Sequence, residues 1–246
     1  MSIAQDIVAK GGDALIQRCA KAVTAADRVL AAAKVGVKAK IAEAGGVDQA
    51  QHAAHGLAWL ATTVEALRQM QLWAARLKDV GKLGEMEILL LAAAFAEYSA
   101  QIAGGIPMSQ LEIIRPAAMG VGRAEISAFE NDVADLIADG GHESVKARLA
   151  ELIRHQQGAT TYGNSGLDET MSEIHEQMRK FSEAEVVPHA HEWHLANEYI
   201  PLEIIQHVAE LGVFGLTLPE EFGGLGLGKL AMCVVSEELS RGYIGV

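Results

Sequence analysis

Three histidines near residue 190 are the first side chains to consider for chemistry, because imidazoles bind metal ions. His191 and His194 are three residues apart, so a helix would present both on one face, with His189 close by. No cysteine and no suitably placed carboxylate completes a recognisable set of ligands. We therefore expect ordinary polar and capping roles for these histidines and predict no metal site.

Two pairs of adjacent glutamates, Glu220-Glu221 and Glu237-Glu238, offer the carboxylates that a general base requires. Adjacent residues on a helix point to different faces, and neither pair has a histidine at helical spacing. We therefore expect solvated or helix-capping carboxylates. The sequence predicts no catalytic residue within this chain.

A run of glycines between Leu211 and Gly228 is the most unusual stretch of the sequence. Glycine accepts positive φ and allows close backbone approach, and Pro219 ends any helix that reaches it. The segment Gly224–Gly228 superficially resembles a dinucleotide-binding loop, but the spacing differs and no strand precedes it. We predict a helix that enters a compact loop without a nucleotide-binding role.

The composition is that of a globular, mostly helical protein. Hydrophobic residues make up 50% of the 246 residues and there are only five prolines, which suits one or two well-packed domains. A net charge of −12 without any Lys/Arg-rich tract argues against nucleic-acid or anionic-membrane binding. Cys19 and Cys233 do not make a disulfide framework, so we expect free thiols.

The chain shows no sign of export or of a membrane anchor. The longest apolar run, Ile88 to Ala96, falls short of the roughly 20 residues that cross a bilayer. The first residues, Met1 to Asp6, lack the basic and apolar blocks of a secretion signal. We therefore expect a cytoplasmic protein.

Apolar residues at helical spacing predict a bundle of helices in residues 1–120. Two helices, or one long broken helix, are expected before residue 45. Two apolar stripes then indicate a pair of helices, antiparallel because the loop between them is short. The stripes are Leu57, Leu60, Val64, Leu67, Gln71 and Ala74, followed by Ile88, Leu91, Ala92, Phe95, Ser99 and Ile102. A second face with Trp59, Ala66 and Trp73 predicts that the first of these helices is contacted from two sides.

Residues 121–166 are more polar and are punctuated by glycines, which predicts a connecting region with short helices at 126–137 and 143–155. Turn-forming residues place the domain boundary near Gly158–Gly166. Residues 167–246 are helical again, with Asp168 as N-cap and an interruption at Pro188. The stripe of a last helix follows Gly228: Ala231, Val234, Val235, Glu238 and Leu239.

Several segments after residue 178 together resemble the N-terminal helical domain of the flavin-dependent acyl-CoA dehydrogenases. They are Arg179-Lys180-Phe181, Val187-Pro188-His189-Ala190 with Trp193, Pro201-Leu202, Leu211 to Leu216, Pro219 to Leu227, and Ser236 to Arg241. The fold class that follows is all-α: a helical bundle extension (1–120), the connecting region, and this N-terminal α-domain (167–246), incomplete at its C-terminal end.

The resemblance implies oxidation of an acyl-CoA at its α and β carbons, in which a base removes the α-proton and FAD accepts the β-hydride. In that family the catalytic glutamate and most flavin contacts belong to domains that follow this one. The resemblance places Tyr243 and Val246 near one wall of the acyl pocket. It also implies an electron-transfer flavoprotein as acceptor and a homo-oligomer, while this chain by itself is expected to be inactive and to retain no FAD.

The extension carries its own resemblance. Gln101 to Gly105 is similar to a glutamine and glycine pair in the C-terminal helical domain of the same family, which approaches the flavin of a neighbouring subunit. One hypothesis is that residues 1–120 are a degenerate copy of that bundle, and the alternative is a plain helix end. Further segments narrow the resemblance to one branch of the family: Gly105–Gln110, Tyr162–Glu169, Pro188–Leu195 and Glu237–Val246. A stand-alone helical module that binds another dehydrogenase subunit remains the other interpretation.

Overall fold

The computed structural model describes residues 1–157, 159 and 161–246, and the chain forms two compact units, Met1–Gly166 and Leu167–Val246. Helices make up almost all regular structure in the described residues, so the all-α prediction is confirmed. Gly158, where the sequence analysis places the start of the domain boundary, lies outside the described residues.

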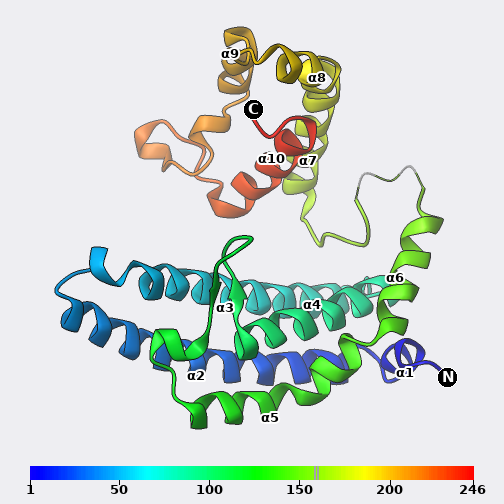
Figure 1. The fold of residues 1–246 in the computed structure, drawn as a ribbon. Helices are drawn as coiled ribbons and strands as arrows, with labels where there is room; N and C mark the ends of the chain where they lie inside the picture. Colours follow the sequence, from blue (N-terminus) through cyan, green and yellow to red (C-terminus); the bar gives the residue numbers. More distant parts are fainter. Residues whose placement is uncertain (158, 160) are drawn as a thin grey trace. The chain divides into compact units, whose positions relative to one another are not determined.

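Unit 1 is built on long helices whose directions alternate along the chain (Figure 1). They are α2 (Gly12–Ala44), α3 (Gln51–Asp79), α4 (Glu85–Gly104) and α5 (Arg123–Gly140), with α1 (Ile3–Ala9) before them and α6 (Glu143–His155) after them. Both α2 and α4 pack against α3 and α5. The core between them contains large, fully buried side chains, among them Leu60, Leu67, Leu91, Phe95 and Phe129.

Capping residues set the helix ends of unit 1. The side chain of Ser2 accepts from the backbone of Gln5 and closes a capping box on α1. Gly11, at φ +80°, separates α1 from α2, which confirms two helices before residue 45. The carboxylate of Glu87 accepts a hydrogen bond from the backbone N–H of Gly84 at 3.0 Å and caps α4.

The predicted stripes are largely correct. Every stripe residue of α4 is buried, and those of α3 are buried or half-buried. The second contacted face predicted for α3 is correct only at Trp73, which is half-buried, because Trp59 is 39% exposed and Ala66 is exposed. By length and composition α4 reaches the size of a membrane span, and 56% of its most apolar window is buried within the unit. Its apolar character is therefore accounted for by the core of unit 1.

Residues 121–166 differ from the predicted connecting region. α5 extends from 123 to 140 and contributes the buried Phe129, Val133 and Leu136 to the core of unit 1. Its end approaches α4 so closely that a Cβ on Gly140 would lie 2.1 Å from the carbonyl oxygen of Ala92. These residues therefore belong to the same unit as α2, α3 and α4. A short antiparallel ribbon, β1 (Ile106–Pro107) with β2 (Ile113–Ile114), precedes α5.

Unit 2 contains α7 (Glu169–Phe181), α8 (Val187–Ala196), α9 (Leu202–Glu210) and α10 (Gly228–Gly242). Asp168 caps α7 by accepting from the backbone N–H of Met171 at 2.8 Å, as predicted. α7 continues into α8 through a π-helical turn, in which Val187 N–H donates to the carbonyl of Ser182. The turn lies immediately before Pro188, which has no N–H to donate, so the interruption is a local rearrangement and not a break.

The core of unit 2 lies between α7 and α10, which pack against one another. All five residues of the stripe predicted for the last helix are buried on α10. Ala231, Val235 and Leu239 share a core with apolar side chains of α7, α8 and α9, among them Met171, Met178, Phe181, Trp193 and Val208.

Candidate functional site

The glycine-rich segment folds back on itself after α9. Gly212, at φ +77°, ends the helix. The backbone N–H groups of Leu225 and Leu227 then donate to the carbonyls of Gly215 and Leu216, both at 2.9 Å. A Cβ on Gly224 would lie 2.1 Å from the carbonyl oxygen of Leu218, so this close pairing requires glycine. The compact loop holds its leucines beside α7 and α10.

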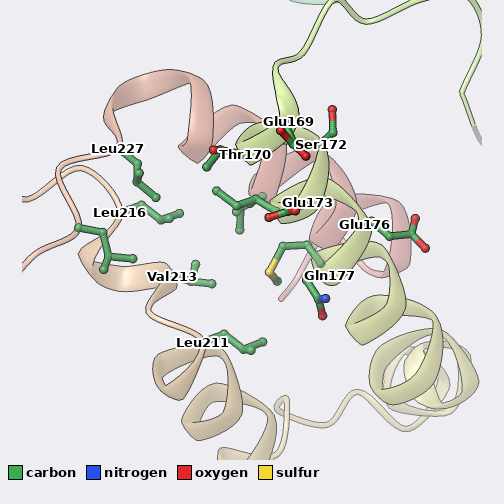
Figure 2. Close-up of a pocket in the computed structure, with 14 residues that line it drawn as sticks. Glu169, Thr170, Ser172, Glu173, Glu176, Gln177, Leu211, Val213, Leu216 and Leu227 are labelled. Atoms are coloured by element: carbon green, nitrogen blue, oxygen red, sulfur yellow. The ribbon is translucent and has the colours of Figure 1, made fainter.

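An open hollow of about 1000 Å³ lies between this loop, α7 and the start of α10 (Figure 2). Its apolar wall consists of Ile174, Met178, Leu211, Val213, Leu216, Leu225, Leu227 and Val235. Its polar rim consists of Glu169, Thr170, Ser172, Glu173, Glu176 and Gln177, all from α7. Figure 2 shows Leu211, Val213, Leu216 and Leu227 on one side and the α7 side chains on the other. We call this feature the apolar hollow.

The apolar hollow has a buried floor and exposed edges. Met178, Leu216 and Val235 are buried in the core of unit 2 and form the floor. Leu211 and Leu225 are 43% and 45% exposed and form the edge. Exposed leucines around a concave apolar surface are typical of a site that receives a side chain of another molecule.

The rim of the apolar hollow is acidic. Among the described residues Glu169 and Glu173 make no ion pair. Glu176 lies 2.9 Å from Nη2 of Arg179, and the hydrogen bond from this guanidinium is the main reason that the pKa of Glu176 is lowered. The rim therefore carries negative charge at neutral pH, and it suits a partner with basic groups around an apolar one.

The three histidines, His189, His191 and His194, lie on exposed positions of α8. The ring of His189 stacks on Trp193 with centroids 5.8 Å apart. Within the described part of the chain, no group of three or more His, Cys, Asp or Glu side chains has metal-binding geometry.

The prediction for the second glutamate pair is wrong at Glu238. Glu237 is exposed, but Glu238 has no exposed surface. Its Oε2 accepts a hydrogen bond from Nε of Arg241 at 2.9 Å, and its Oε1 lies 2.8 Å from Nε2 of His175. Glu238 is therefore a buried partner of Arg241, with His175 of α7 beside it, and not a solvated carboxylate. Glu220 and Glu221 are exposed, as predicted.

Tyr243 and Val246 lie at the C-terminal end of α10. Tyr243 is half-buried, with its ring centroid 6.3 Å from that of Trp193. The N–H of Val246 donates to the carbonyl of Tyr243 at 3.0 Å, which places the two residues in one turn. Neither residue lines the apolar hollow, which contacts α10 through Val235.

The apolar hollow was missed at the sequence level. Ile174, Met178 and Val235 have the helical spacing that predicts a buried core. Their spacing does not show that they border an open hollow instead of lying inside the domain. The one available signal is the loop from Leu211 to Leu227, where exposed leucines alternate with glycines.

Two kinds of comparison with known proteins agree with this architecture. Residues 168–246 match the family model described as acyl-CoA dehydrogenase, N-terminal domain. The chain is 52% identical over 220 residues to a (2S)-methylsuccinyl-CoA dehydrogenase of Cereibacter sphaeroides, an alignment that covers 89% of this chain and 38% of that protein. The segments Gly105–Gln110, Tyr162–Glu169, Pro188–Leu195 and Glu237–Val246 indicate the branch of the family to which this enzyme belongs.

Other relatives match a smaller part of the chain. Mitochondrial isovaleryl-CoA dehydrogenase of Solanum tuberosum is 33% identical over 109 residues, which are 42% of this chain and 26% of that protein. Glutaryl-CoA dehydrogenase of Desulfococcus multivorans is 36% identical over 78 residues, which are 31% of this chain and 20% of that protein. The chain thus spans well under half the length of these relatives. Its recognition from the motifs is confirmed: residues 168–246 carry the acyl-CoA dehydrogenase N-terminal domain, within a chain similar to the N-terminal portion of a methylsuccinyl-CoA dehydrogenase.

Proposed function

We propose that this chain is the N-terminal portion of an FAD-dependent acyl-CoA dehydrogenase that oxidises (2S)-methylsuccinyl-CoA to mesaconyl-CoA. The observation that carries the proposal is the 52% identity to (2S)-methylsuccinyl-CoA dehydrogenase over 89% of the chain. The reaction is the one that the family implies, with removal of the α-proton by a base and transfer of the β-hydride to FAD. The catalytic base and most flavin contacts then lie outside this chain.

We propose that unit 2 does not hold FAD by itself. The polar rim of the apolar hollow consists of carboxylates and neutral side chains, and Glu169 and Glu173 would repel the two phosphates of FAD. The role that we propose for this chain is therefore to shape and cover one side of the substrate cavity. Tyr243 and Val246 are the proposed contributions to its wall.

The test of this function uses the complete polypeptide and the isolated chain side by side. The complete polypeptide is expected to bind FAD, visible as flavin absorbance, and to oxidise methylsuccinyl-CoA. The 246-residue chain is expected to be colourless and inactive. A colourless complete polypeptide would favour the second interpretation, a helical module that binds another dehydrogenase subunit. Substitution of Tyr243 by Ala is expected to raise the KM for the acyl-CoA more than it lowers activity.

We further propose that the apolar hollow receives the electron-accepting partner, an electron-transfer flavoprotein. An open apolar floor, with Glu169 and Glu173 on its rim outside any ion pair of the described residues, suits an apolar side chain that is surrounded by basic groups on the partner. We also propose that the complete enzyme is a homo-oligomer located in the cytoplasm.

Docking is tested by Leu211→Asp, which places a charge at the edge of the apolar hollow. The KM for the flavoprotein acceptor is expected to rise about tenfold or more, while oxidation with a small artificial electron acceptor stays at the wild-type rate. Leu195→Asp, at a leucine on α8 that is 71% exposed and outside the hollow, is the control. Equal losses with both acceptors would show that the hollow supports the chemistry and not the docking.

A further inference from the structure

Asn164, in the segment between α6 and α7, is bound to unit 1 through both its backbone N–H and its backbone carbonyl. The N–H of Asn164 donates to Oε1 of Glu87 at 2.6 Å, and the carbonyl oxygen of Asn164 accepts from Nε1 of Trp73 at 3.0 Å. Trp73 belongs to α3 and Glu87 to the first turn of α4. Side chains from two helices therefore bind both backbone groups of Asn164.

The side chain of Glu87 is held in place by a contact that does not involve Asn164. Glu87 is almost fully buried, at 7% exposure, and its second oxygen accepts from the N–H of Gly84 at 3.0 Å. The N-terminal end of a helix stabilises a carboxylate in this position. A hydrogen bond from a backbone N–H to a fixed carboxylate is stronger than one between neutral groups. Glu87 thus provides a preformed acceptor.

Two glycines, Gly163 before Asn164 and Gly166 two residues after it, have backbone conformations that favour glycine. Gly163 and Gly166 adopt φ values of +78° and +70°. A Cβ on Gly163 would lie 3.1 Å from Oε1 of Glu87, and one on Gly166 would lie 3.2 Å from Leu77 Cδ2. The side chain of Asn164 accepts from the N–H of Gly166 at 2.9 Å and closes the turn.

We propose that the surface formed by Trp73, Leu77 and Glu87 is a peptide-binding slot that recognises the segment Gly163–Gly166. Its ligand class is a Gly-Asn-x-Gly peptide in this turn conformation, bound through backbone groups and selected by the two glycines. In this chain the ligand is the segment that leads into unit 2. The inference does not depend on the proposed function, because it concerns contacts within unit 1.

The peptide-binding slot suggests what the helical extension, residues 1–120, does for the domain that follows it. Only Leu167 stands between the end of the bound segment and Asp168, the N-cap of α7. By holding residues 163–166, unit 1 reduces the tether before α7 to very few residues. The extension thus anchors the polypeptide immediately before the acyl-CoA dehydrogenase domain.

Hydrogen–deuterium exchange of the whole chain, read on peptides that cover residues 162–168, tests the slot. Trp73→Phe keeps the aromatic ring and removes the N–H donor, so exchange in this segment is expected to become about fivefold faster, the effect of one lost hydrogen bond. Trp59→Phe is the matched control, since its Nε1 donates to His55 within α3. Gly163→Ala is expected to accelerate exchange further, whereas Gly81→Ala has the same positive φ (+67°) with no atom within 4 Å and is expected to leave the segment unchanged.

The proposal is overturned if the wild-type segment exchanges as fast as an unstructured peptide. It is equally overturned if Trp73→Phe and Gly163→Ala leave the exchange at the wild-type rate. Far-UV circular dichroism of each variant checks that the bundle is intact, and Gly163 lies outside the helices, so its substitution reports on the slot even if Trp73→Phe destabilises α3.

Discussion

Nε2 of His175 lies 2.8 Å from Oε1 of Glu238, a carboxylate with no exposed surface, and this contact joins α7 to α10. Within the described residues Oε1 accepts no hydrogen bond of good geometry, although the imidazole lies this close. The other oxygen accepts from Arg241, whose Nη2 also lies 3.3 Å from Glu183. The buried carboxylate of Glu238 thus has one cationic partner, Arg241, and the imidazole of His175 beside its other oxygen.

Replacement of Glu238 is expected to destabilise unit 2 strongly. Glu238→Ala leaves Arg241 and His175 without their buried partner, which costs about 3 kcal/mol of unfolding free energy. Glu237→Ala, at the exposed neighbour, is expected to change stability by no more than about 0.5 kcal/mol. Urea unfolding, followed by hydrogen exchange of peptides from α7 and α10, measures both. Similar values for the two variants would contradict the buried role of Glu238.

Ser182 and Gly242 form a tight contact between the π-helical turn and α10. A Cβ on Gly242 would lie 2.1 Å from Oγ of Ser182, a buried hydroxyl that has no hydrogen-bond partner among the described residues. Gly242→Ala is therefore expected to cost about 2 kcal/mol of stability. Ser182→Ala removes an unsatisfied hydroxyl and is expected to be neutral or stabilising.

The double variant Ser182→Ala with Gly242→Ala tests whether the clash with the Ser182 hydroxyl causes the loss of stability in Gly242→Ala. It is expected to recover most of the stability that Gly242→Ala loses, because the remaining Cβ of residue 182 lies 3.4 Å away. Thermal unfolding of the four proteins gives the coupling energy. Additive effects in this cycle would show that Gly242 is required for another reason.

Gly36 allows α2 to approach the 3₁₀ turn Pro116–Met119. A Cβ there would lie 2.3 Å from the carbonyl oxygen of Met119 and 2.7 Å from Cα of Gly120. Gly36→Ala is expected to destabilise unit 1 by about 2 to 3 kcal/mol, since backbone has to move. Gly104→Ala, in α4 with no atom within 4 Å, is expected to be neutral or stabilising by up to about 1 kcal/mol. Chemical denaturation compares the two.

Unit 1 is expected to lose stability in acid through the pair of Glu85 and Arg148, which joins α4 to α6. The hydrogen bond from Arg148, with Nε 2.7 Å from Oε1, lowers the pKa of Glu85. A lowered folded-state pKa contributes stability above the unfolded carboxyl pKa of about 4.3, and this contribution is lost as the pH falls through the lower folded value. The effect is small, because both side chains are about a third exposed (36% and 37%).

Arg148→Gln is therefore expected to flatten the dependence of unfolding free energy on pH between about pH 5 and pH 3. Arg154→Gln, at a cation on the same helix that makes no ion pair within the described residues, serves as control and is expected to keep the wild-type slope. An unchanged slope for Arg148→Gln would assign the acid sensitivity to other carboxylates.

The elements with strong periodicity could be predicted well from the sequence. The stripes of α4 and α10 are buried as expected, because burial of one face follows directly from the 3.6-residue period. α5 is longer than predicted and belongs to the bundle. Glycines punctuate its region, but Gly140 serves the close approach to Ala92 and does not mark a linker. A glycine alone does not reveal which of these roles it has.

The sequence by itself determined the all-α fold class, most helix positions and the family, since periodicity, capping residues and motif spacing are local properties. Only the tertiary structure decided that Glu238 is a buried ion-pair partner, that Glu87 and Trp73 bind the backbone of Asn164, and that the leucines after Leu211 border an open hollow. Each of these features depends on which faces of distant helices meet. That choice is made by packing of the whole unit, and no local pattern in the chain encodes it.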